Sequence, residues 1–85
     1  MIARVFGPGG GSGGLFMESV DLSDQIDSST QIFTLSAFRR GSLLVFYNGI
    51  AQRNGVEIIE QSNSQFRTDF IPTTGSTLLV FYQPL

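Results

Sequence analysis

The sequence predicts an all-β protein: a small antiparallel β-sandwich with an extended glycine-rich N-terminal arm. Three observations predict this class. Short apolar stretches recur at ~8–12-residue spacing, tight-turn dipeptides separate them, and no segment has the periodicity of an amphipathic helix. Eighty-five residues allow a single domain. We expect residues 1–14 to form the arm and residues 15–85 to form the sandwich module.

The strand prediction depends most on a motif that occurs twice, Gly-Ser-Leu-Leu-Val-Phe-Tyr at 41–47 and Gly-Ser-Thr-Leu-Leu-Val-Phe-Tyr at 75–82. Side chains alternate across a strand, and in both copies both faces are apolar. A strand with one face in water would keep that face polar. We therefore expect one face in the core and the other covered by another subunit or by long neighbouring side chains. The second face carries Leu44, Phe46, Leu79 and Phe81.

Turn residues separate the predicted strands. Asn48-Gly49 predicts a two-residue hairpin, because both positions accept positive φ in a type I′ turn, and Asn54-Gly55 and Gly75 mark further turns. Each copy of the repeated motif follows a Phe-rich strand and a Gly-Ser turn, which indicates a duplicated hairpin. The predicted strands span residues 19–22, 31–37, 42–47, 50–53, 56–60, 65–70 and 76–82.

The N-terminal arm has an apolar start followed by six glycines within residues 7–14. Such a stretch is typical of a flexible linker, or of an ordered arm whose backbone passes close to a neighbour. In the second case the terminal segment would add as a strand to a partner's sheet edge. The residues near the N-terminus that we expect in an assembly interface are Ile2, Val5, Phe6, Leu15 and Phe16.

Charge is scarce in this chain. Five Arg, no Lys and seven carboxylates leave 14% of the residues charged, against ~25% in an ordinary soluble domain. No basic patch is present to neutralise phosphates, so we expect no nucleic-acid partner. With no Cys, no disulfide can support so small a core, and oligomerisation is the usual remaining source of stability.

Membrane insertion is not expected either. The longest apolar runs are five residues long, whereas a membrane-spanning helix needs ~20. The first residues lack the apolar core of a secretory signal. We expect synthesis in a cytoplasm and no membrane partner.

Residues for catalysis or metal binding are few. His, Cys and Lys are absent, which removes the usual nucleophile–base pairs and the commonest zinc ligands. We interpret the acidic pairs Asp24/Asp27 and Glu57/Glu60 as solvated charges. Asp21, Asp24 and Asp27 lack the central Gly and the terminal Glu of a calcium loop. We therefore predict no enzymatic activity, no cofactor and no metal site.

Arg39 and Arg40 lie in the turn before the first copy of the repeated motif. Such a pair can be a solvated loop or can form salt bridges. We predict that both residues pair with the acidic segment 18–27 of a neighbouring subunit, and we prefer this to an anion site.

The order of these motifs is similar to that of small β-sandwich modules in tailed-bacteriophage virion structural proteins, of the fibre and head-decoration type. The resemblance covers residues 32–82 and departs from the family at Ile58-Ile59, where a more polar strand is expected. The glycine arm is not part of the module. The matching stretches are Phe33-Thr-Leu, Gly41-Ser-Leu-Leu-Val-Phe-Tyr-Asn-Gly-Ile-Ala-Gln, Phe66-Arg-Thr-Asp-Phe-Ile-Pro and Gly75-Ser-Thr-Leu-Leu-Val-Phe-Tyr.

This resemblance implies a structural protein of the virion that assembles as a homotrimer or higher oligomer and carries no catalytic residues. We favour capsid decoration or a cement role, with the N-terminal arm docking on other virion proteins. The alternative is a tail or neck fibre or adaptor that binds a receptor or glycan. A glycan site is not favoured, because the chain has no Trp and because Tyr47 and Tyr82 lie in strands predicted to be buried.

Overall fold

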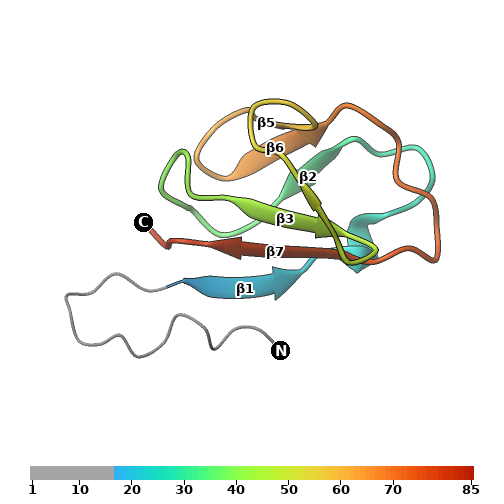
Figure 1. The fold of residues 1–85 in the computed structure, drawn as a ribbon, viewed down its shortest axis with the longest axis horizontal. Helices are drawn as coiled ribbons and strands as arrows, with labels where there is room; N and C mark the ends of the chain where they lie inside the picture. Colours follow the sequence, from blue (N-terminus) through green and yellow to red (C-terminus); the bar gives the residue numbers. More distant parts are fainter. Residues whose placement is uncertain (1–16) are drawn as a thin grey trace.

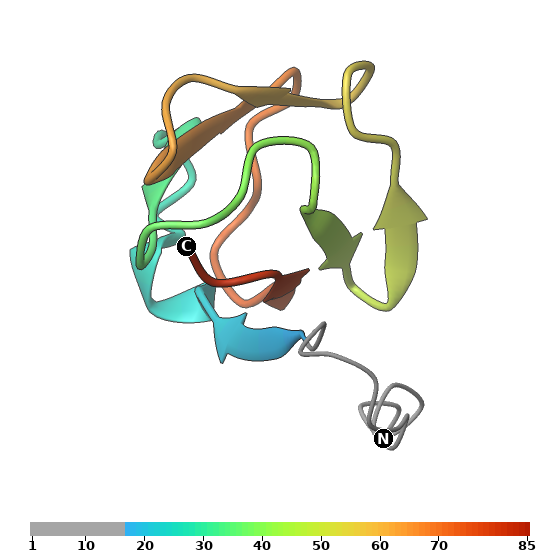
Figure 2. The same cartoon turned by 90° about the vertical axis from the view of Figure 1, so that its left-hand side faces the viewer.

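The computed structural model describes residues 17–85, which form two antiparallel sheets packed face to face (Figure 1). Sheet A has the strand order β1-β7-β3-β4, and sheet B has the order β2-β6-β5. In Figure 2, β6 lies above the interior and β1 and β7 lie below it. The all-β sandwich predicted from the sequence is therefore confirmed for these residues. The predicted arm, residues 1–14, lies outside them.

Every predicted strand has a counterpart, usually shorter than expected. Residues 17–85 also contain a short 3-10 helix, η3 (Ser23–Gln25), after the first strand. The strands are β1 (Glu18–Asp21), β2 (Ile32–Thr34), β3 (Leu44–Tyr47), β4 (Ile50–Gln52), β5 (Ile58–Glu60), β6 (Gln65–Thr68) and β7 (Leu78–Tyr82).

The start of β5 differs from the prediction for a local reason. Residues 56 and 57 lie in a turn, because Gly55 has a φ of 92° and the N–H groups of Val56 and Ile58 both bond to the carbonyl of Arg53. Because these residues form a turn closed by the Arg53 carbonyl, they cannot also be extended and pair with β6. The strand therefore begins only at Ile58.

The duplicated hairpin expected from the sequence is wrong. Each Phe-rich strand and the motif strand that follows it lie in different sheets: β2 and β6 in sheet B, β3 and β7 in sheet A. Phe33 lies directly opposite Phe66, and Val45 lies directly opposite Val80, both in antiparallel pairs. Equivalent residues thus face each other in both sheets.

The core lies between the two sheets. Phe33 and Phe66 are fully buried, and their rings stack with centroids 5.6 Å apart. The inner faces of the repeated strands contribute as predicted, with Tyr47 packed against the edge of the cluster. The cluster consists of Leu22, Ile26, Phe33, Leu35, Phe38, Leu43, Val45, Ile58, Phe66, Leu78, Val80 and Tyr82.

The hairpin between β3 and β4 is confirmed at the predicted residues. Asn48 has a φ of 52° and Gly49 a φ of 83°, the two positive values that a type I′ turn requires. The Asn48 side chain adds a second constraint, because its Oδ1 accepts the N–H of Thr77 at 2.9 Å. The turn therefore links the β3–β4 hairpin to the start of β7.

Replacing Gly49 with Ala should lower the free energy of unfolding by ~1 kcal/mol, because an L side chain is strained at this positive φ. No atom lies within 4 Å of the added Cβ, so the backbone alone carries the cost. Urea denaturation measures the change. Gly49→Asn is the matched control and should lose less, since Asn tolerates left-handed φ. Equal losses in both variants would contradict this explanation.

Replacing Phe66 with Ala should cost ~3–5 kcal/mol, the usual range for removing a fully buried aromatic ring. This is a large share of the ~5–15 kcal/mol that stabilises a typical native protein. The thermal unfolding midpoint, followed by circular dichroism, measures the loss. Ile71→Ala, at a side chain 51% exposed, serves as the control. Equal midpoints for the two variants would show that the stacked pair does not organise the core.

Candidate assembly interface

The outward side of sheet A carries the four apolar residues predicted to be covered by a second layer. Leu44 lies opposite Phe81, and Phe46 lies opposite Leu79, across the β3–β7 pair. Directly opposite side chains in an antiparallel pair project to the same face and touch. The four residues therefore form one continuous apolar block, which we call the outer face.

The block is only partly buried. Leu44 is 45% exposed, Phe46 and Leu79 are half-buried, and Phe81 is buried. The rings of Phe46 and Phe81 meet edge to face, with centroids 5.9 Å apart. This packing holds both rings in place, so the outer face is preformed.

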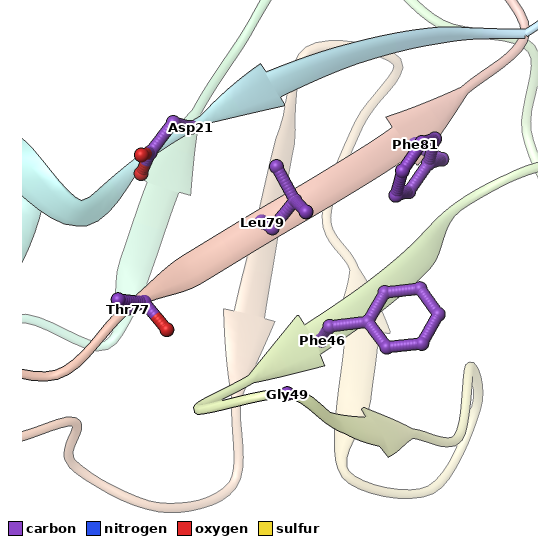
Figure 3. Close-up of a pocket in the computed structure, with 6 residues that line it drawn as sticks. All are labelled: Asp21, Phe46, Gly49, Thr77, Leu79 and Phe81. Carbon is purple, nitrogen blue, oxygen red and sulfur yellow. The ribbon is translucent and has the colours of Figure 1, made fainter. Parts of the chain in front are cut away.

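A hollow of about 460 Å³ opens on this face (Figure 3). In Figure 3, Phe81 on β7 and Phe46 on β3 lie on one side of the hollow and Asp21 on β1 lies on the other, with Leu79 on β7 and Gly49 in the hairpin turn between them. Thr77, just before β7, completes the described lining. The hollow is thus mostly apolar with one acidic wall.

Asp21 is ionised at neutral pH. The hydroxyl and the backbone N–H of Ser23 both donate to its Oδ1, at 2.5 and 2.9 Å, and these two bonds hold the pKa of Asp21 below its usual range. Of the described residues that line the hollow, Asp21 alone is charged. The hollow therefore has a fixed negative charge at one side.

Glu60 organises the two turns at the other end of the module. Its carboxylate accepts the N–H of Gly41 at 2.8 Å, the amide of Asn54 at 2.9 Å and Nε of Arg40 at 2.9 Å. The Glu60 side chain is 9% exposed. One carboxylate thus joins the turn before β3 to the turn before β5.

Burial is the largest influence on Glu60 and by itself would raise its pKa. The hydrogen bonds from Asn54, Gly41 and Arg40 together outweigh burial, and the pKa of Glu60 lies below its usual range. Glu60 is therefore an ionised, structurally used carboxylate. Sequence reasoning had interpreted it as a solvated charge.

The predicted site residues fall into three groups. The arm residues lie outside residues 17–85. Arg40 pairs with Glu60 of its own chain, so its pairing with a neighbour's acidic segment stays a prediction, as does that of Arg39. The third group consists of residues that the structure places in the sheet and its turns: Leu44, Phe46, Leu79, Phe81, Asn48, Gly49, Asn54, Gly55 and Gly75.

Two features of the site were missed by the sequence reasoning. Asp21 lies beside the outer face because β1 pairs with β7 and sets Asp21 opposite Leu79. The second feature is a hydroxyl network, in which the Tyr47 hydroxyl donates to Ser76 at 3.0 Å and accepts the N–H of Thr73 at 3.1 Å. The motif Pro-Thr-Thr-Gly-Ser predicts a turn and contains these hydroxyls. The sequence motif could not show that these hydroxyls bond to Tyr47.

The two tyrosines differ in burial. Tyr82 is 5% exposed, as predicted, and its hydroxyl donates to Glu18. Tyr47 is half-buried, and its ring packs on Phe70 with centroids 4.9 Å apart. Both hydroxyls are used within the module.

Glu57, the other member of the Glu57/Glu60 pair, also takes part in an ion pair within the module. Glu57 forms an ion pair with Arg53 at 2.6 Å, and the hydrogen bonds from Arg53 lower the pKa of Glu57 to about 2. Within residues 17–85 no three His, Cys, Asp or Glu residues are placed to hold a metal ion. Over the same residues no helix is long and apolar enough to cross a membrane.

No family model, curated protein or solved structure matches the chain.

Replacing Glu60 with Gln should lower the free energy of unfolding at pH 7 by ~1–3 kcal/mol, because a nearly buried acceptor of charged hydrogen bonds is lost. A carboxyl whose pKa is lowered on folding stabilises the fold above its unfolded pKa, ~4.3 for Glu. That stability is lost as pH falls through the lower folded pKa.

The difference between wild type and Glu60→Gln should therefore shrink as the pH falls below ~4.3. Chemical denaturation over a pH series measures it. Asp21, Asp27 and Glu57 also have lowered pKa values, so both proteins should weaken in acid, and the difference isolates Glu60. A difference independent of pH would contradict an ionised Glu60.

Proposed function

We propose that this chain is a non-enzymatic structural protein of a bacteriophage particle, and that it assembles as an oligomer and decorates or cements the capsid. The observation that carries the proposal is the outer face of sheet A. A single small module covers its own core and still presents a preformed apolar block with a hollow.

The composition supports an assembled state. Only 14% of the residues are charged, while a small monomer needs a well-charged surface to stay unassociated. With no Cys in the chain, contacts between subunits are the remaining way to stabilise so small a core. An apolar outer face and a sparsely charged surface are both explained by contact with neighbouring subunits.

The resemblance of residues 32–82 to phage virion modules supports the proposed role in a bacteriophage particle. The motif order Phe-Thr-Leu, Gly-Ser-Leu, Asn-Gly and Gly-Ser-Thr corresponds to β2, β3, the β3–β4 turn and the start of β7.

The oligomeric state and the copy number per particle test this proposal. Native mass spectrometry of the purified chain should give a trimer or a higher oligomer. Quantitative mass spectrometry of particles should then find copies in the hundreds. A dozen copies or fewer would instead indicate the neck or tail. A monomer at micromolar concentration that does not attach to particles would refute the proposal.

Replacing Phe46 with Ser should weaken subunit association by about 10- to 100-fold, because losing a hot-spot aromatic costs ~2 kcal/mol or more. Analytical ultracentrifugation measures the association constant. Ile71→Ser, at an exposed apolar side chain outside the outer face, is the control. Circular dichroism should show both variants folded. Unchanged association in the Phe46 variant would show that the outer face is not the interface.

A further inference from the structure

We propose that the hollow on the outer face of one copy receives residues 2–6 of a second copy, with Phe6 in the hollow and Arg4 beside Asp21. The inference rests on the proposed function and deepens it by naming the occupant of the outer face. It assigns the apolar start of the chain as the ligand and sheet A as its receptor.

The apolar part of the match is a matter of size and surface. The hollow of about 460 Å³ is walled by Phe46, Leu79 and Phe81. Pockets that bind compact ligands measure ~300–1,000 Å³ and are mostly apolar. One aromatic ring with part of a neighbouring aliphatic chain suits this space, and residues 2–6 contain Ile2, Val5 and Phe6.

The polar part of the match is a matter of charge and spacing. In an extended segment Ile2, Arg4 and Phe6 project to one side, each ~6.6 Å from the next. On the receiving surface Asp21 lies directly opposite Leu79 across the β1–β7 pair. Side chains opposite each other are ~5 Å apart at Cβ. A cation two residues from an apolar anchor can therefore meet Asp21 while the anchor contacts Leu79.

Arg4 is the only charged residue among residues 1–17, and Asp21 is the only charge in the described lining of the hollow. An arginine paired with a carboxylate forms charge-assisted hydrogen bonds that are stronger than neutral ones. The pairing of these two residues fixes the direction in which the segment lies on the sheet.

The length of the connecting chain allows the segment to reach a second copy. Residues 7–17 separate Phe6 from the start of β1, and eleven residues reach ~36 Å when extended. The hollow begins beside Asp21, three residues along β1, or ~10 Å from its start. A connection this long exceeds what docking on its own sheet needs, and it can cross to a neighbouring subunit.

The area of the outer face points the same way. A stable interface buries ~1,200–2,000 Å² in total, and four partly buried side chains are too few to supply it. Packing two outer faces directly together would also bury two Asp21 carboxylates with no cation among the described lining residues to pair with them. An inserted segment with one cation adds buried area and neutralises that charge.

Cysteine cross-linking of the full chain tests the proposal, because the native sequence has no Cys. The variants are Gly7→Cys, next to Phe6, and Thr77→Cys, at the edge of the hollow. An oxidised mixture of the two should form mixed disulfide dimers. Their rate should exceed that of Gly7→Cys with Ser36→Cys by about 100-fold, because docked sulfurs react at a millimolar effective concentration, against about 10 μM for free protein. Ser36 is an exposed control position between β2 and β3.

A charge experiment in the same cross-linking assay identifies the partner of Arg4. Adding Arg4→Glu to the Gly7→Cys chain should slow cross-linking about tenfold, since repulsion from Asp21 replaces a charge-assisted bond. This loss of cross-linking rate should be much smaller when the Thr77→Cys chain also carries Asp21→Asn. The Asn side chain keeps an oxygen that can accept the hydrogen bonds from Ser23. Asp24→Asn, an exposed acid in η3, should leave the full loss in place.

Three outcomes would overturn the proposal. A disulfide formed only within a Gly7→Cys/Thr77→Cys double variant would show that each arm covers its own sheet. Thr77→Cys dimers that form faster than the mixed ones would show direct packing of two outer faces. Cross-linking of Gly7→Cys with Thr77→Cys that is no faster than cross-linking of Gly7→Cys with Ser36→Cys would show no docking. In all three cases an oligomeric wild type would leave the proposed function standing, whereas a monomeric wild type that ignores particles would refute both.

Discussion

The sandwich depends on the direct opposition of Phe33 and Phe66 at the centre of sheet B. Both rings are fully buried and stacked, and they fix the register of β2 on β6. In sheet A, Val45 lies opposite Val80 in the same way. A one-residue slip in either pair would turn every inner side chain outward. The core and the outer face both follow from these two registers.

The same pairing explains why an apolar surface remains outside. The repeated strands are apolar on both faces, and the core can use only one face of each. Because β3 and β7 are neighbours, their unused faces merge into one block rather than two separate patches. β1 then brings Asp21 to the edge of the block. Duplication of one strand motif therefore yields, within a single chain, one continuous apolar surface on the outward side of sheet A.

Local signals in the sequence predicted the fold class, the strands and the Asn48-Gly49 turn, because alternation and positive φ are properties of a few neighbouring residues. Apart from the β3–β4 hairpin, they could not predict which strands pair. Phe33 and Phe66 are 33 residues apart, and a hairpin within each half satisfies the same alternation. Glu60 was interpreted as solvated for a similar reason. Its partners Gly41 and Asn54 belong to two different turns, which only the packed sandwich brings together.

The sequence alone established that both faces of the repeated strands are apolar, that charge is scarce, and that neither disulfides nor His or Cys metal ligands could support the core. These are matters of composition and alternation, which need no coordinates. The tertiary structure decided that the two outward faces form one surface. It also decided where the hollow lies on that surface and that Asp21 supplies the charge in its described lining. Those properties arise from contacts between β1, β3 and β7, because pairing across long sequence separations is set by the packing of the whole domain.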